Sequence, residues 1–194
     1  MRIISGIAGG RRLVVPTTND VRPTTDRVRE ALFSHLGSRV AGSRILDLFA
    51  GSGALGLESL SRGATSVVFV ERSKKVFSFL KKNVTELAFE DRCTCRPGDG
   101  LSFLSAHKDS ELVFDLIFLD PPYDAGLLAK ALALISEHRC LTQNGLIVAE
   151  HRWDLSLTEL KLSPKLQIVR SKQYGKTAVT TIEWAPPQTA DVAQ

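Results

Sequence analysis

Apolar and polar residues alternate along most of the chain with two different periods. After residue 44, short runs of consecutive apolar residues predict buried strands, and between these runs apolar residues recur every three or four positions, as on one face of a helix. Buried strands that alternate with amphipathic helices are typical of an α/β fold with a doubly wound, mostly parallel sheet. The predicted strands are residues 44–50, 66–71, 93–99, 114–120 and 145–150, and the predicted helices are residues 53–62, 73–89, 100–107 and 126–138.

The first 43 residues predict a small extension ahead of this pattern. Residues 2–15 contain two apolar runs on either side of a Gly-Gly pair, which favours a β-hairpin. Thr24 or Thr25 can then cap a helix whose apolar residues recur at helical spacing from Val28 to Leu36. We therefore expect a hairpin and one helix before the main domain.

The C-terminal part predicts an antiparallel hairpin and a tail. Residues 166–171 and 177–184 have strand character on either side of Gly175, and no strong helix pattern separates them. The polar residues at the end are typical of a disordered terminus. The expected organisation is an N-terminal extension at residues 1–43, a main domain at residues 44–185 and a disordered tail at residues 186–194.

Composition indicates a globular protein rather than a membrane, secreted or metal-binding one. The chain has 194 residues, of which 43% are hydrophobic, and it contains no uninterrupted apolar run long enough to span a bilayer. Arginines and glycines occupy the N-terminus, where a secretion signal requires a long apolar stretch. The three cysteines are too few for a disulfide framework or a four-thiolate zinc site, and the four histidines are scattered. We expect a cytoplasmic protein without a metal or a membrane partner.

Positive charge is concentrated near the N-terminus. The net charge is +4, and residues 1–44 contain eight arginines against three acidic residues, whereas the remainder contains 17 basic and 18 acidic residues. Because guanidinium groups bind phosphates well, this distribution favours a nucleic-acid partner, although a solvated basic face would produce the same pattern. The candidate contacts are Arg11, Arg12, Arg22, Thr24, Thr25, Arg27 and Arg29.

The segment ILDLFAGSGALG, residues 45–56, contains the spacing G-x-G-x-x-G between a predicted strand and a predicted helix. Such a loop lets the backbone approach an anionic group, either a pyrophosphate or the carboxylate of an amino acid. Glu71 ends the next strand, where a carboxylate can bind ribose hydroxyls, and Asp99 follows the third strand, where it can accept from an adenine amino group. The cofactor candidates are Asp47, Phe49, Gly51, Ser52, Gly53, Glu71, Arg72, Asp99 and Gly100.

The fourth predicted strand ends in Asp120-Pro121-Pro122-Tyr123, at the same edge of the sheet. Successive prolines remove two backbone donors and fix two φ angles, so the carbonyl groups of Asp120 and Pro121 form a stiff rim of acceptors. The carboxylate adds another acceptor, and the tyrosine adds a flat aromatic face. This combination favours a planar ligand that carries an NH2 group, and we expect these four residues to act in catalysis.

Asp120-Pro121-Pro122-Tyr123 resembles the D/N-P-P-Y/F signature of methyltransferases that modify exocyclic amines of nucleobases, and LDLFAGSGALGLESLSRGA resembles their S-adenosylmethionine loop. Together with the segments RIISGIAGGRRL and RPTTDRVREALFSHL, the set is similar to the bacterial RsmD family over roughly residues 1–150. The resemblance implies a Rossmann-like class I methyltransferase fold, S-adenosylmethionine as cofactor and methylation of guanine N2 in 16S ribosomal RNA. It also implies a small ribosomal subunit or its assembly intermediate as partner, and we expect a monomer.

Three other functions stay open from the sequence alone. A DNA or RNA methyltransferase acting on adenine N6 or cytosine N4 uses nearly the same chemistry. A NAD-dependent oxidoreductase would share the glycine spacing, and a non-catalytic RNA-binding module would share the basic N-terminal segment. The base that receives a methyl group from the cofactor separates the first of these from a guanine-N2 enzyme.

Overall fold

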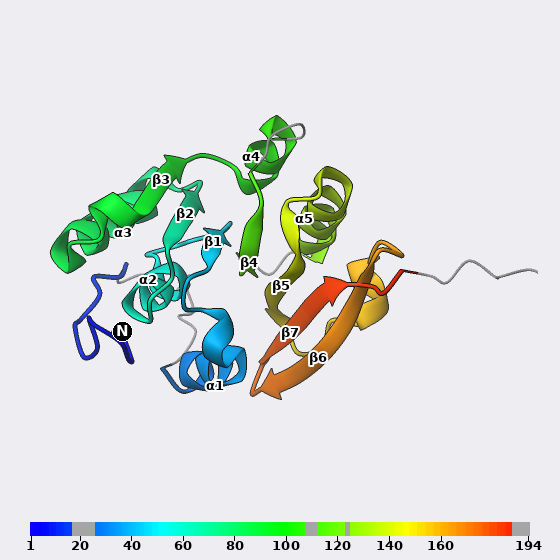
Figure 1. Cartoon of the computed structure of the whole chain (residues 1–194), viewed down its shortest axis with the longest axis horizontal. Helices are drawn as coiled ribbons and strands as arrows, with labels where there is room; N and C mark the ends of the chain where they lie inside the picture. The colour runs from blue at the N-terminus through cyan, green and yellow to red at the C-terminus, as the bar shows by residue number, and fades with distance from the viewer. Residues whose placement is uncertain (17–25, 108–111, 123–124, 188–194) are drawn as a thin grey trace, which may run out of the picture.

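A seven-stranded sheet forms the centre of the computed structural model, which describes residues 1–16, 26–107, 112–122 and 125–187 (Figure 1). The strands lie in the order β3-β2-β1-β4-β5-β7-β6, and every neighbouring pair is parallel except the two pairs that β7 makes. The predicted mostly parallel sheet with a C-terminal antiparallel hairpin is confirmed. The strands are β1 (Arg44–Asp47), β2 (Ser66–Glu71), β3 (Cys93–Pro97), β4 (Phe114–Leu119), β5 (Leu141–Arg152), β6 (Leu166–Tyr174) and β7 (Thr177–Trp184).

Helices cover both faces of the sheet, so the molecule has three layers (Figure 1). The first three helices share one hydrophobic core with one face of the sheet, and the last two share a second core with the other face. The first group is α1 (Asp26–Leu36), α2 (Ala54–Ser61) and α3 (Lys74–Leu87), the second is α4 (Gly100–Ala106) and α5 (Ala125–His138), and short 3-10 segments lie at Gly37–Arg39, Glu90–Arg92 and Leu157–Leu160.

Element boundaries follow local chemistry where a capping residue is present. The Ser73 hydroxyl accepts a hydrogen bond from the backbone N–H of Val76 and so begins α3. β5 is longer than the predicted residues 145–150, because its first residue, Leu141, pairs with Phe114 of β4. The polar residues 142–144 hide this start in the sequence.

The N-terminal segment packs on α2 instead of forming a regular hairpin. Its strand pairing is reduced to one antiparallel bridge between Arg2 and Arg12. The backbone N–H of Ile4 donates to the buried Glu58 carboxylate at 2.6 Å, and the N–H of Ala8 donates to the Ser61 hydroxyl at 2.9 Å. The extension is therefore fixed to the sheet domain through polar groups of α2.

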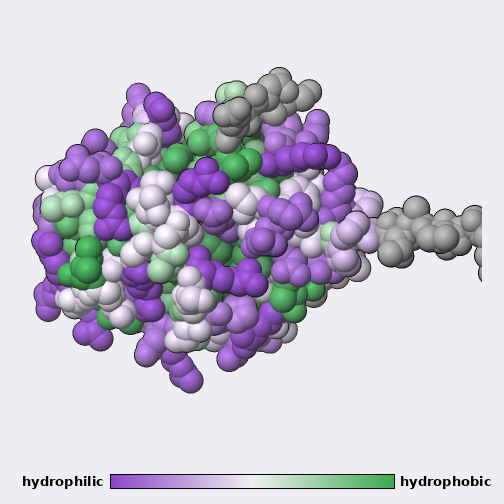
Figure 2. All heavy atoms as spheres, viewed as in Figure 1, coloured by the Kyte–Doolittle hydropathy of each residue, from purple (hydrophilic) through white to green (hydrophobic). Residues whose placement is uncertain are grey.

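The order of the strands creates a crevice between β1 and β4. The chain continues from β1 to β2 on one side and from β4 to β5 on the other side of this pair. The helices that follow β1 and β4, α2 and α5, lie on opposite faces of the sheet and leave space above the carboxyl ends of the two strands. Ligands of doubly wound sheets bind at such a point. Figure 2 shows hydrophilic residues spread over the face of the molecule seen in Figure 1, with apolar residues in smaller groups between them. Among the described residues, no helix is long and apolar enough to cross a membrane.

Candidate active site

The three glycines of the G-x-G-x-x-G segment, which spans the loop after β1 and the first turn of α2, are needed for two different reasons. Gly51 has φ +56° and Gly53 has φ +89°, a left-handed conformation that side chains disfavour. Gly56 has an ordinary φ, but a Cβ atom there would lie 2.2 Å from the Phe69 ring of β2. The first two glycines shape the loop, and the third lets α2 pack closely on the sheet.

Buried polar groups hold this loop from behind. The Asp47 carboxylate accepts a hydrogen bond from the backbone N–H of Gly56 at 3.0 Å, and the Asn83 amide donates to the carbonyl of Ser52 at 2.9 Å. Burial raises the pKa of Asp47 to about 7; the Gly56 hydrogen bond opposes this rise, and the nearby Glu71 carboxylate adds to it. Asp47 therefore supports the loop from inside the protein.

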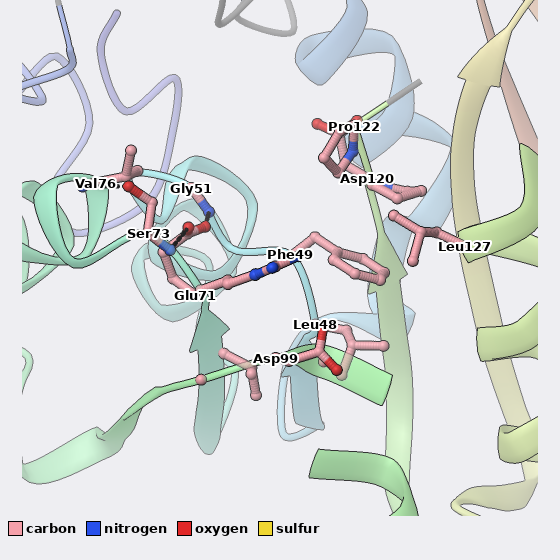
Figure 3. Close-up of a pocket in the computed structure, with 15 residues that line it drawn as sticks. Leu48, Phe49, Gly51, Glu71, Ser73, Val76, Asp99, Asp120, Pro122 and Leu127 are labelled. Atoms are coloured by element: carbon pink, nitrogen blue, oxygen red, sulfur yellow. Dashed lines mark hydrogen bonds between the residues drawn. The ribbon is translucent and has the colours of Figure 1, made fainter. Parts of the chain in front are cut away.

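A cavity of about 410 Å³ opens in front of the loop, at the carboxyl ends of four strands (Figure 3). Its size is within the range of pockets that hold small organic ligands. Six of the nine predicted cofactor residues line it, whereas Asp47, Ser52 and Gly53 do not. The wall consists of Leu48, Phe49, Gly51, Val70, Glu71, Arg72, Ser73, Val76, Gly98, Asp99, Gly100, Asp120, Pro121, Pro122 and Leu127.

Glu71 forms the centre of one wall. Its carboxylate accepts hydrogen bonds from the backbone N–H of Gly51 at 2.9 Å and of Ser73 at 2.6 Å (Figure 3). These two bonds connect the glycine loop to the end of β2 and to the start of α3. Each carboxylate oxygen has a further lone pair for a ligand hydroxyl.

Asp99 lies in the floor of the cavity and caps α4. Its carboxylate accepts from the backbone N–H of Ser102 at 2.9 Å and from the Ser102 hydroxyl at 3.0 Å. The hydrogen bond from the Ser102 backbone lowers the pKa of Asp99, so this carboxyl group is ionised at neutral pH. Gly100 is needed beside it, because a Cβ atom there would lie 3.0 Å from the carbonyl of Leu48.

The Asp120-Pro121-Pro122 corner forms the opposite wall. Figure 3 shows Asp120 and Pro122 across the cavity from Glu71, with the Phe49 ring directed toward β4 between them. Pro121 is buried and Pro122 is exposed, so the chain turns outward at the second proline. Tyr123, the fourth predicted catalytic residue, lies outside the described residues.

Three carboxyl groups meet behind this corner. Leu119 pairs with Ala149, which brings Asp120 beside Glu150 of β5 at the end of the β4–β5 ladder. Burial raises the pKa of Asp120 well above its ordinary value, and the charges of Glu150 and Asp47 raise it further. The sequence analysis did not select Glu150; the one sequence signal is that it ends an apolar run, as Asp120 does, and the pairing of the two strands is seen only in the structure.

The predicted RNA contacts are placed in different ways. Arg11, Arg12 and Arg27 are exposed, and the Arg11 guanidinium donates to the carbonyl of Glu86. Arg22, Thr24 and Thr25 lie outside the described residues.

Arg29 requires a correction. The prediction that it binds phosphates is wrong, because its side chain is 0% exposed; it donates to Asp26 at 2.8 Å and lies 3.8 Å from the Glu58 carboxylate. Its spacing with Phe33 and Leu36 places it on the buried face of α1, and this spacing was visible in the sequence.

Comparisons with known proteins agree with this architecture. The family model "Conserved hypothetical protein 95" matches residues 1–183. A Haemophilus influenzae protein named "Ribosomal RNA small subunit methyltransferase D" is 40% identical, with 81% of each chain covered, and the Escherichia coli K12 protein of the same name is 37% identical, with 92% of this chain and 87% of that one covered. The solved structure of a hypothetical protein from Thermus thermophilus superposes with a TM-score of 0.79 at 34% identity and covers 94% of this chain and 99% of that one.

Proposed function

The chain belongs to the ribosomal RNA small subunit methyltransferase D (RsmD) family and has a Rossmann-like class I methyltransferase fold. From this premise we propose that it transfers a methyl group from S-adenosylmethionine to the exocyclic N2 amine of a guanine in small-subunit ribosomal RNA. One observation carries the proposal. A wall suited to a nucleoside, around Glu71, and a wall suited to an amine, around Asp120, face each other across one cavity.

The cavity fits S-adenosylmethionine. Glu71 would accept from the ribose hydroxyls, Asp99 from the adenine amino group, and the methionyl part would lie against Gly51. Phe49, Arg72 and Gly100 complete the walls, while Asp47, Ser52 and Gly53 act by fixing the loop. The bound cofactor supplies an electrophilic methyl group on a sulfonium sulfur.

The protein's own part is to orient a weak nucleophile. The lone pair of the guanine amine is delocalised into the ring, so the nitrogen must become more pyramidal before it can react. The Asp120 carboxylate and the Pro121 carbonyl would accept hydrogen bonds from the two N–H groups of the amine. These bonds would direct the nitrogen lone pair into the cavity and stabilise the positive charge that develops on nitrogen. Tyr123 would stack on the base, which must be unpaired or rotated out of its helix.

The position of Asp120 also suits it to receive a proton. Its raised pKa makes the ionised Asp120 carboxylate a stronger base than an ordinary aspartate. After methyl transfer, Asp120 can hold the amine proton and release it to water. Only the ionised carboxylate can do this, so we expect activity to rise as Asp120 loses its own proton.

Exposed arginines would hold the RNA around this site. The exposure of Arg11, Arg12 and Arg27 supports this role, and Arg22, Thr24 and Thr25 belong to the same basic segment. We propose that the enzyme acts as a cytoplasmic monomer on ribosomal RNA within a small subunit or its assembly intermediate.

Mass-spectrometric mapping of small-subunit RNA tests the proposal. RNA from cells without this gene should lack one N2-methylguanine that wild-type RNA contains, and a plasmid copy of the gene should restore it. A copy carrying Asp120→Ala should not restore it. An unchanged guanine methylation pattern in cells without the gene, or a missing methyl group on adenine or cytosine, would overturn the assignment.

A further inference from the structure

The C-terminal hairpin is positively charged, although the net charge of residues 45–194 does not show it. Residues 164–182, which contain β6, its turn and most of β7, include four basic residues and no aspartate or glutamate. Acidic residues elsewhere cancel this charge in the total for residues 45–194. The hairpin is therefore a second basic segment, separate from the N-terminal one.

The strand register places one end of this hairpin at the edge of the sheet that holds the active site. Arg152, the last residue of β5, pairs with Thr177 of β7, which in turn pairs with Tyr174 of β6. The backbone N–H of Trp153 donates to the carbonyl of Lys176 at 3.3 Å. Since β5 is parallel to β4, the carboxyl ends of both strands, and thus Arg152 and Asp120, lie at the same edge.

The hairpin end is also on the same face of the sheet as the carboxylates. Val148 and Val179 belong to the core beneath α1, α2 and α3, and Glu150 follows Val148 by two residues. Glu150 pairs with Val179, and Val179 pairs with Lys172, so these three side chains project to one face. Lys172 is two strand spacings from Glu150, about 10 Å across the sheet.

The side chains at this end combine exposed cations with accessible aromatic rings. Trp153 is 52% exposed, and the ammonium group of Lys172 lies 5.3 Å from the centre of the half-buried Tyr174 ring. Lys172 and Lys176 are exposed, and the Arg152 side chain is 60% exposed although it pairs with Asp154. Surfaces that bind single-stranded nucleic acid usually combine such groups: the cations bind phosphates, and the aromatic rings stack on bases.

We propose that Arg152, Trp153, Lys172, Tyr174 and Lys176, the hairpin-end patch, form a second RNA-binding surface. The patch binds phosphates and one unpaired base of the strand next to the target nucleotide, while the N-terminal segment holds the RNA on its other side. The inference rests on the proposed function, because it assigns the patch to the same substrate. Its positive charge and aromatic rings match RNA rather than an apolar protein surface.

The first test removes charge and compares two double variants. Lys172→Ala with Lys176→Ala changes the patch, and Lys161→Ala with Lys165→Ala removes two exposed lysines that precede β6 and lie outside the patch. Affinity for deproteinised small-subunit RNA is measured at several salt concentrations. The patch variant should bind more weakly, and the slope of log Kd against log salt should fall by about 1.4, since each phosphate contact contributes about 0.7. The control should behave as the wild type.

The second test removes the aromatic face. Trp153→Ala should weaken RNA binding about tenfold, the effect of losing one stacked base, and Trp153→Phe should retain most of the affinity. S-adenosylmethionine affinity should be unchanged in every variant, because no patch residue lines the cavity.

The outcomes separate this inference from the proposed function. If the patch variants bind and methylate RNA as well as the control does, the inference is overturned while the enzyme's activity stands. If they bind deproteinised RNA normally but fail on small-subunit particles, the patch contacts protein, which also overturns it. If the wild type methylates no RNA, the proposed function fails, and the binding comparison still decides the role of the patch.

Discussion

The two walls of the cavity differ in how their polar groups are satisfied. On the β1–β2 wall, the Glu71 carboxylate accepts two backbone hydrogen bonds, and the Asn83 amide holds the carbonyl of Ser52. On the β4–β5 wall, the half-buried Asp120 lies near the like charges of Glu150 and Asp47, and its pKa is raised. The first wall is preorganised for binding, whereas the second retains the unfavourable electrostatics that acid–base chemistry requires.

Removing the carboxylate of the second wall should have the largest effect. We expect Asp120→Ala to reduce methyl transfer by about 100-fold or more, because the amine loses both an acceptor and a proton acceptor. S-adenosylmethionine should still bind, which calorimetry can measure. Asp120→Asn keeps an acceptor oxygen but cannot take a proton. If this variant is partly active and its pH–rate profile lacks the fall in activity at low pH, the hydrogen-bonding role of Asp120 is separated from its role as proton acceptor. Equal activity in all three proteins would remove Asp120 from the mechanism.

The same change on the first wall should affect binding. Glu71→Ala should weaken S-adenosylmethionine binding roughly 10- to 100-fold, because charged hydrogen bonds to the ligand and the connection between Gly51 and Ser73 are lost. At saturating cofactor, kcat should change much less than KM. A large fall in kcat with an unchanged KM would show that the division of roles between the walls is incorrect.

Gly51 and Gly56 of the G-x-G-x-x-G segment should differ in their effect on stability. Gly56→Ala should lower the free energy of unfolding by about 3 kcal/mol, because the new Cβ would overlap the Phe69 ring. Gly51→Ala has open space around it and should cost about 1 to 2 kcal/mol, from the left-handed φ alone. Urea denaturation of both variants checks the order, and a larger loss for Gly51→Ala would contradict the packing argument.

The smallest effect should come from the neighbour of Asp120. Glu150→Gln removes a negative charge that raises the pKa of Asp120, so this pKa should fall toward its ordinary value. If activity rises as Asp120 ionises, as we propose, the acidic limb of the pH–rate profile should move to lower pH, with little change in the plateau. An acidic limb that stays at the same pH, or moves to higher pH, would show that the charge of Glu150 does not raise the pKa of Asp120.

The two walls also differ in how far the sequence could predict them. Strands in a parallel sheet are buried on both faces, so their continuous apolar runs located β2 and β4 closely, and with them Glu71 and Asp120. The role of Glu150 depends on the β4–β5 register, which the sequence does not contain.

Charge was the least predictable property, because it depends on tertiary partners. Arg29 is a basic residue in a basic segment, yet it is buried, where it pairs with the interior Glu58 and with the half-exposed Asp26. The sum of charges also concealed the C-terminal hairpin, where the pairing of β6 with β7 and of β7 with β5 brings Lys172 and Lys176 to the end that carries Arg152. A sum of charges along the chain describes neither case.

The identity of the methylated base tests the central claim most directly. Purified enzyme is incubated with methyl-labelled S-adenosylmethionine and small-subunit RNA from cells that lack this gene, and the RNA is then digested to nucleosides. We predict label in N2-methylguanosine with the wild type and, over the same time, about 100-fold less or below detection with Asp120→Ala. Label in N6-methyladenosine or N4-methylcytosine, or equal labelling by the two proteins, would contradict the account.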